Sequence, residues 1–119
     1  MLNFVLIPGR GYIQLSWSSN YKKASFDLFG DDRLFRKPDM VKQQQLAWLT
    51  AYWFWKKNIH SKTSISLGYF GASTKIINGY IECGRGRKEN KAKKRFELYK
   101  KVMKAFNLME KPIENGCYN

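Results

Sequence analysis

The sequence predicts an all-α fold in which residues 1–119 form a single domain. Near the C-terminal end, apolar side chains recur at steps of three, four and three, which is the spacing of one helix face: Phe96, Tyr99, Met103 and Phe106. A second segment, 46–55, is apolar nearly all round and has no glycine or proline. A third is bounded by serines before it and a glycine after it, as helices commonly are.

The first two helices are expected at 18–28 and 38–58. Before them, 9–17 is typical of a turn followed by a short extended run. Ser18 or Ser19 is placed to cap the first helix, and Gly30 to end it. Pro38 suits the first turn of the second helix, where a missing N–H costs nothing. Because 46–55 is apolar on all sides, we expect it to be buried at the centre of the domain. A sugar-stacking platform is the alternative for its Trp and Tyr side chains.

Two further helices are expected at 73–83 and 90–107, after a loop from His60 to Gly71. Glycines at 84 and 86 separate them. The outward face of the last helix carries four lysines: Lys93, Lys100, Lys101 and Lys104. The tail from Ile113 is polar, so it is expected to be loose unless Cys117 holds it.

The chain is strongly basic, with 22 Lys and Arg against 9 Asp and Glu, a net charge of +13. Much of the excess lies in Arg85–Lys104. Such a balance fits nucleic acid, an anionic cell wall or membrane surface, or solubility alone. A solvated helix face explains the cluster without any partner. There is no zinc-finger spacing or aromatic ribonucleoprotein motif, so a nucleic-acid partner is not expected.

No membrane span, metal or cofactor is expected. No apolar run approaches the roughly 18–20 residues that cross a bilayer. The opening MLNFVLIP lacks the basic leader and cleavage site of a signal peptide. Cys83 and Cys117 are the two cysteines and His60 the one histidine, without the spacing of a zinc site. The residues alone leave open whether the cysteines are two buried thiols or one disulfide.

Six stretches, taken in order, resemble the family 19 glycoside hydrolases, the plant-type endochitinases. GRGYIQLSWSSNY at 9–21 resembles the family's GRGPIQLSxNxNY, and FGASTKIINGYIECGRG at 70–86 its FGxxTNIINGGxECGxG. Shorter matches are PDMV at 38–41, YWFW at 52–55, RFELY at 95–99 and the terminal CYN. Order and approximate spacing hold over nearly the whole chain. The resemblance covers the C-terminal part of the family's lysozyme-like, mainly helical catalytic domain.

This resemblance implies a sugar-binding cleft for β-1,4-linked N-acetylglucosamine polymers such as chitin. The implied substrate-contacting residues are Gln14, Ser16, Asn20, Lys62 and Asn78, with Ser16 also positioning the attacking water. Ser16 and Asn20 would share a helix face if the first helix began a little early; otherwise Ser16 is a strand or cap residue. The loop around Lys62 is shortened and altered, which weakens its assignment.

Glu82 stands among isoleucines, where a carboxylate needs a partner or must be exposed. The resemblance implies that it pairs with Arg95, and helical spacing places Asn78 on the same face, four residues earlier. The resemblance also implies a disulfide between Cys83 and Cys117, and hence an oxidising, extracellular compartment.

The family's general acid and general base are glutamates of the preceding half, to which no part of this chain corresponds. No complete catalytic set is therefore expected here, although Glu82, Arg95 and Ser16 support one by resemblance. The first hypothesis is a chitinase half that is inactive alone, with a missing or separate N-terminal half as its partner. The second is a non-catalytic carbohydrate- or cell-wall-binding module with a basic face, and the third is a nucleic-acid binder.

Overall fold

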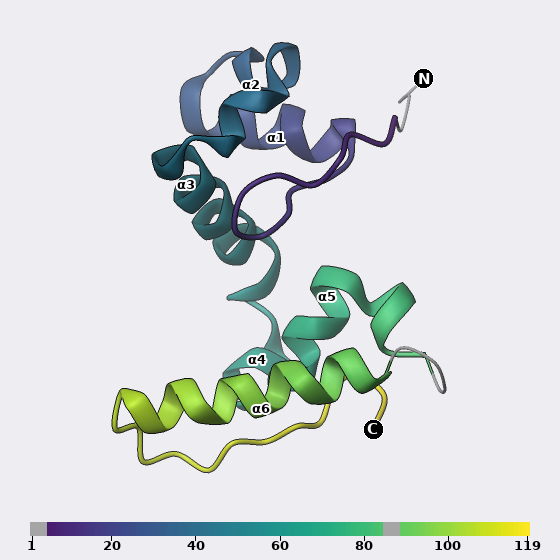
Figure 1. The fold of residues 1–119 in the computed structure, drawn as a ribbon, viewed down its shortest axis with the longest axis vertical. Coiled ribbons are helices and arrows are strands. Elements are labelled where there is room, and N and C mark those ends of the chain that lie inside the picture. The colour runs from purple at the N-terminus through teal and green to yellow at the C-terminus, as the bar shows by residue number, and fades with distance from the viewer. Residues whose placement is uncertain (1–4, 85–88) are drawn as a thin grey trace. The chain divides into compact units, whose positions relative to one another are not determined.

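The computed structural model describes residues 5–84 and 89–119 (Figure 1). The segment 85–88, expected in a basic loop, lies outside these residues. The elements in order are α1 (Ser18–Phe29), α2 (Arg33–Arg36), the 3₁₀-helix η1 (Pro38–Lys42), α3 (Gln44–Phe54), the π-helical turn η2 (Trp55–Ile59), α4 (Thr63–Ser66), α5 (Phe70–Glu82) and α6 (Glu89–Ala105). Only isolated β-bridges, Arg10–Leu15 and Tyr69–Ile113, accompany them in the described ranges. The all-α class is confirmed. None of these helices is long and apolar enough to cross a membrane.

The chain divides into two compact units, residues 1–57 and 58–119. The first contains α1, α2 and α3. Its buried core is formed by Leu15, Tyr21, Ala24, Leu34, Val41 and Trp53. Two buried polar groups of α1 tie its neighbours to it: Tyr21 Oη donates to Pro8 O (3.0 Å), and Ser25 Oγ accepts from Leu34 N (2.9 Å). The N-terminal segment and α2 are therefore both fixed to α1.

The first helix begins at Ser18 and ends at Gly30 in the left-handed conformation, close to the expected bounds. The expected serine cap is wrong. Trp17 occupies the cap position, and no side chain there bonds to the helix. Instead the N-terminal segment satisfies an N–H group of the first turn: Val5 O accepts from Ser18 N at 2.8 Å. In return, Ser18 Oγ accepts from Val5 N at 3.2 Å. The serine is thus the first residue of the helix and is bonded to the N-terminal segment.

The single helix expected at 38–58 is wrong, because the chain breaks at Gln43. Pro38 does open a helical turn, but that turn is η1, and Gln43 is extended (φ −65°, ψ 136°) before α3 begins. On one continuous helix Val41 and Ala47 would lie about 120° apart around the axis. The break resets the register so that both are buried, Val41 fully and Ala47 at 6% exposure.

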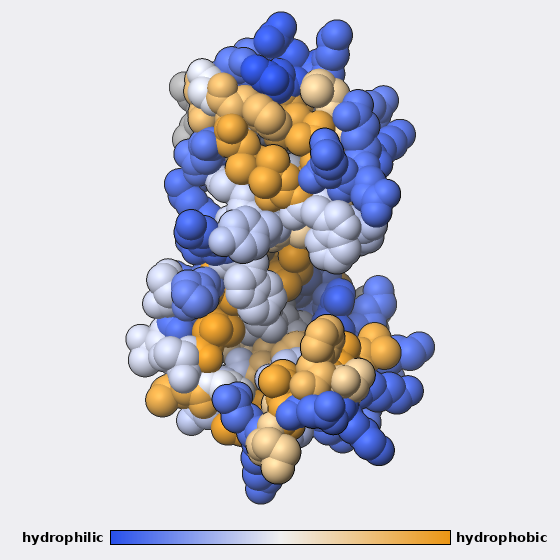
Figure 2. Space-filling model, turned by 90° about the vertical axis from the view of Figure 1, so that its left-hand side faces the viewer, coloured by the Kyte–Doolittle hydropathy of each residue, from blue (hydrophilic) through white to orange (hydrophobic). Residues whose placement is uncertain are grey.

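The expectation that 46–55 is buried all round is also wrong. Only Ala47, Thr50 and Trp53 of α3 are buried. Four large side chains of the segment are 37–65% exposed: Trp48, Leu49, Tyr52 and Trp55. In the upper part of Figure 2, which shows the first unit, orange and pale side chains gather on one face between blue ones. Within its unit, α3 therefore packs through one stripe.

The second unit contains α4, α5 and α6. The third expected helix is confirmed as α5 but begins three residues earlier, and α4 replaces part of the expected loop. The last is confirmed as α6, which ends at Ala105, so Phe106 is 73% exposed and outside the stripe. Phe70 of α5 packs against Phe96 and Tyr99 of α6, with ring centroids 5.9 and 4.4 Å apart. This aromatic contact joins the two long helices of the unit.

The C-terminal tail returns along α6 and reaches the start of α5 (Figure 1). There Ile113 O accepts from Phe70 N (2.9 Å) and Glu114 O from Gly71 N (3.1 Å). These are N–H groups that the first turn of a helix cannot satisfy internally. The tail is therefore the N-terminal cap of α5, whereas its sequence predicts only a segment that is loose unless Cys117 holds it.

Gly71→Ala is expected to displace this tail and destabilise the second unit by about 2 kcal/mol, within the range for overpacking. An added methyl would lie 2.8 Å from both Asn115 O and Cys117 N, which are backbone atoms that cannot rotate away. Gly84→Ala is the matched control, since no atom lies within 4 Å of its added methyl. Urea unfolding followed by the amide exchange of α5 measures both. Equal stability of the two variants would show that the close approach does not restrict the residue.

Candidate functional site

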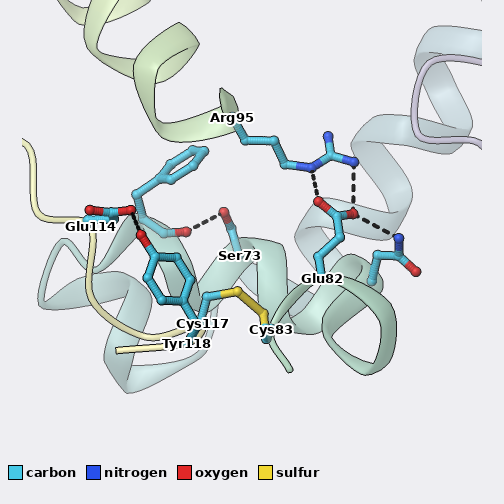
Figure 3. The surroundings of a disulfide bond; sticks show 9 residues. Ser73, Glu82, Cys83, Arg95, Glu114, Cys117 and Tyr118 are labelled. Carbon is cyan, nitrogen blue, oxygen red and sulfur yellow. Dashed lines mark hydrogen bonds and ion pairs between the residues drawn. A yellow bond between two sulfur atoms is a disulfide. The ribbon is translucent and has the colours of Figure 1, made fainter. Parts of the chain in front are cut away.

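A carboxylate network forms the centre of the second unit's candidate site (Figure 3). Arg95 reaches from α6 and donates through Nε to Glu82 Oε1 (2.6 Å) and through Nη2 to Oε2 (2.9 Å). Asn78 Nδ2, one helical turn before Glu82, donates to the same Oε2 at 2.8 Å. The three residues meet as predicted, even though α5 is kinked at Asn78 (φ −152°, ψ 35°). The sequence gives no signal for this kink beyond the glycine that follows.

Glu82 is in a position that is unfavourable for a charged carboxylate. Its side chain is fully buried, and it is the last residue of α5, where the helix dipole disfavours an anion. The two-pronged bond from Arg95 lowers the pKa of Glu82 below its ordinary 4.5, and the Asn78 amide adds to this, against the raising effect of burial. The carboxylate is thus ionised at neutral pH. It can orient neighbouring groups, but it cannot donate a proton to a leaving oxygen.

The disulfide lies directly beside this network. Cys83 follows Glu82 and bonds to Cys117 of the tail, with the two Cα atoms 4.8 Å apart. The pairing implied by the resemblance is confirmed. Beyond it, Tyr118 Oη donates to Glu114, and burial followed by this carboxylate raises the pKa of the tyrosine to about 12. The tail, the end of α5 and the buried carboxylate are therefore one connected structure (Figure 3).

Gln14, Ser16 and Asn20 lie together in the first unit, around the turn before α1. Gln14 Nε2 donates to Gly11 O (2.8 Å), Ser16 Oγ to Gln14 O (2.9 Å), and Asn20 Nδ2 to Ser16 O (3.0 Å). The helix does not begin early, so Ser16 and Asn20 do not share a helix face. A chain of side-chain bonds to backbone carbonyls holds them close instead.

Two residues of this turn have left-handed backbones without being glycine: Gln14 at φ 55° and Trp17 at φ 71°. Such conformations cost about 1–3 kcal/mol each and persist where the surroundings enforce them, often at functional sites. Gly11, also left-handed at φ 78°, lets the turn approach α3, since an added methyl would lie 3.1 Å from Ala47 Cα. The strain thus falls on the segment that carries the predicted sugar contacts. Neither glutamine nor tryptophan is a residue type that indicates such a backbone.

Lys62 is exposed and precedes α4 as its N-terminal flanking residue. Among the described residues, no hydrogen bond or ion pair joins its side chain to either group of candidate residues. The residues named from sequence therefore form two groups, one in each unit: Gln14, Ser16 and Asn20 in the first, and Asn78, Glu82 and Arg95 in the second. Lys62 belongs to the second unit but not to its network.

The first unit has a groove that the sequence does not predict. It has a volume of about 510 Å³ and is lined by Asp27, Leu28, Leu49, Tyr52, Trp53, Lys56 and Lys57. Asp27 Oδ2 accepts from the Trp53 indole N–H and from Lys57 Nζ, both at 2.8 Å. These bonds, Lys57 first, lower the pKa of Asp27. Asp27 stands in a polar stretch of the sequence, so only its contact with Trp53 in the folded chain distinguishes it from the other surface carboxylates.

Across the described residues, no three His, Cys, Asp or Glu side chains are grouped to hold a metal ion.

Comparison with known proteins identifies the family of the chain. The family described as chitinase class I, Glyco_hydro_19, matches residues 6–67, just over half of the chain. The chain belongs to glycoside hydrolase family 19. The acidic endochitinase SP2 of Beta vulgaris is 37% identical over 100 residues, and the endochitinase CHI of Arabidopsis thaliana is 41% identical over 92. The matches cover 84% and 76% of this chain but only 33% and 31% of those proteins.

The family's solved structures give the same fold. Chitinase C of Streptomyces griseus HUT6037 superposes with a TM-score of 0.73 at 30% identity, covering 91% of this chain and 44% of that one. Another bacterial family 19 chitinase gives a TM-score of 0.70 at 32% identity, covering 91% and 54%. The chain thus spans about a third of these plant relatives and about half of the bacterial structures. The lysozyme-like, mainly helical fold expected from sequence is the fold of this family.

Proposed function

We propose that this family 19 chain is a partial catalytic domain, with both units belonging to one domain, that contacts β-1,4-linked N-acetylglucosamine polymers and does not hydrolyse them alone. The proposal rests on one observation: Glu82 is buried, paired with Arg95 and ionised at neutral pH. Inverting hydrolysis needs one carboxylic acid and one carboxylate about 6.5–9.5 Å apart. The buried carboxylate of the described chain is instead bonded to Arg95 and Asn78, and its pKa is lowered.

The other shifted carboxyl groups support the same conclusion. Arg33 lowers the pKa of Asp31 to about 2, Lys57 lowers that of Asp27, and Lys42 with Arg10 that of Asp39. Every displaced carboxyl pKa among the described residues is displaced downward, the wrong direction for a general acid. We assign Glu82 and Arg95 a supporting role, Ser16 the positioning of water, and Gln14, Asn20, Asn78 and Lys62 contacts with sugar.

The purified chain is expected to release no reducing ends from chitin hexamer above a Glu82→Gln control, and to bind the hexamer only weakly. Each general acid or base contributes about 10²–10⁴-fold to rate, so the lack of both leaves little turnover. Binding is weak because contacts on one wall leave much of the ligand exposed. Robust turnover that Glu82→Gln abolishes would contradict the proposal.

A complementation experiment tests the proposed partner. The exposed aromatic side chains of α3 are proposed to pack against the missing or separate N-terminal half of the domain. All four tryptophans lie in the first unit, at 17, 48, 53 and 55. Adding the preceding half of a family 19 enzyme is expected to shift tryptophan emission to shorter wavelength and to restore hydrolysis. If emission shifts and hydrolysis stays absent, the chain is a binding partner without catalytic competence.

The second candidate function is a non-catalytic module that binds chitin or cell-wall polysaccharide. It is favoured by the hydrogen-bonded Gln14, Ser16 and Asn20 group, which needs no catalytic carboxylate to contact sugar. Binding of neutral chitin through such bonds should change little with salt, whereas phosphate-driven binding of nucleic acid would weaken steeply. For either candidate, the Cys83–Cys117 disulfide supports a secreted protein in an oxidising compartment.

A further inference from the structure

The outward face of α6 carries a row of lysines that the proposed sugar site does not use. The helix has seven Lys or Arg residues and two Glu in 17 residues, a net charge of +5. Three of the seven have carboxylate partners: Lys93 with Glu89, Lys100 with Glu97 and Arg95 with Glu82. The remaining four form no ion pair with the described chain: Lys91, Lys94, Lys101 and Lys104.

These four lysines lie along one side of the helix. Lys91 and Lys94 are three residues apart, as are Lys101 and Lys104, and Lys94 and Lys101 are two turns apart. Ala92, Phe96 and Met103 are the buried residues of α6 and point the other way, into the unit. At 1.5 Å rise per residue, the row is about 20 Å long. All four side chains are exposed, so their charges are open to a partner that is itself extended.

We propose that this lysine row binds an acidic polysaccharide, a chain of carboxylated sugars, by charge complementarity. The row shares no residue with the Glu82 network or with the proposed chitin contacts. A linear polymer with a carboxylate on each sugar can meet successive ammonium groups without a pocket. Lysine suits this role because its ammonium is a flexible point charge that requires no fixed geometry.

Two other anionic partners fit the surface less well. A lipid surface is bound by amphipathic helices that bury a continuous apolar face. In α6 that face is turned to Phe70 of α5 through Phe96 and Tyr99, and the exposed Leu98 and Val102 stand among lysines. Single-stranded nucleic acid is bound through exposed aromatic platforms and favours arginine forks. The arginine of α6, Arg95, is committed to Glu82, and the two aromatic rings of the helix face Phe70.

The experiment measures binding of the whole chain to polygalacturonate at increasing salt, beside the fully methyl-esterified polymer, which has the same backbone without charge. The triple variant Lys94→Gln, Lys101→Gln, Lys104→Gln is compared with Lys22→Gln, Lys23→Gln, Lys37→Gln. The second set removes the same charge from exposed lysines of the first unit. Circular dichroism and intact mass confirm that both variants are folded and disulfide-bonded.

Wild type is expected to bind the charged polymer and not the ester, with affinity falling as salt rises. The α6 variant is expected to lose about tenfold or more at low salt, with a shallower salt dependence, and the control about threefold or less. Equal losses in both variants would reduce the effect to net charge and overturn the proposal. So would absence of binding by wild type, equal binding of the ester, or tighter binding to single-stranded DNA or anionic lipid vesicles of matched charge.

Discussion

Replacing both cysteines, Cys83→Ala with Cys117→Ala, is expected to lower the free energy of unfolding of the second unit by roughly 3–4 kcal/mol. The disulfide closes a loop of sequence separation 34, and this is the cost of that closure in the chain-entropy model. The closed loop contains the whole of α6 and the return of the tail. Its release frees the segment whose carbonyls cap Phe70 and Gly71 at the start of α5.

Hydrogen exchange read by mass spectrometry resolves the effect along the chain. Exchange should rise in peptides of α5, α6 and the tail, and first in the tail. Peptides of α1 and α3 are an internal reference, because the disulfide joins two positions of the second unit. Reducing the wild-type protein should reproduce the same pattern. If α5 and α6 stay as protected as in the oxidised protein, the hydrogen bonds of the tail hold it without the disulfide.

The helices were predictable from sequence where a local signal decides them. The apolar spacing of 96–103 placed α6 within two residues, and Gly30 ended α1 as expected. Breaks that depend on packing were not predictable. Gln43 is extended because Val41 and Ala47 must both face the core, and no property of glutamine indicates this. The capping of α1 was missed for a similar reason, because a distant segment at Val5, and not a serine side chain, bonds to Ser18 at its start.

The candidate site was predictable where helix geometry or resemblance gave a pair. Asn78 and Glu82 follow from a four-residue spacing, while Arg95 and the disulfide follow from the resemblance to family 19. The exposure of Trp48 and Tyr52 could not be derived, because composition indicates that a segment is apolar but not what covers it. The strained backbones of Gln14 and Trp17 depend likewise on contacts that only the folded chain defines.

Arg95→Met is expected to destabilise the second unit by about 2–4 kcal/mol at neutral pH. Removing one partner of a buried ion pair leaves the other charge uncompensated, which costs about 3–5 kcal/mol when both are buried. Half of the Arg95 side chain is exposed while Glu82 is fully buried, so solvent screening lowers the expected loss below that range, to about 2–4 kcal/mol. Lys93→Met on the same helix is the matched control. Its pair with Glu89 is longer (3.6 Å) and more exposed, and a surface pair contributes about 0–1 kcal/mol.

The double variant Glu82→Gln with Arg95→Met is expected to recover most of the loss. A neutral amide at 82 removes the buried charge and can still accept a hydrogen bond from Asn78. Replacing both partners of a buried pair is often nearly neutral, whereas removing one is not. Urea unfolding of the two single variants and the double variant measures the coupling. Additive losses would show that Glu82 is adequately solvated without Arg95.

The dependence on pH separates loss of the charge pair from loss of packing. In the wild type, Arg95 lowers the pKa of Glu82 below 4.5, so this pair's stabilisation is fully present above 4.5 and is lost as pH falls through the lower folded value. In Arg95→Met, burial is left opposed mainly by Asn78, and we expect it to raise the pKa of Glu82. The folded variant then binds a proton more readily than the unfolded chain, and its stability increases as pH falls. The stability difference between wild type and variant should therefore be largest at neutral pH. It should begin to shrink above pH 4.5, where the folded variant takes up its proton, and shrink further below pH 4.5, where the wild type loses the pair. A difference that stays constant from pH 7 to pH 3.5 would mean that Arg95 acts through packing alone.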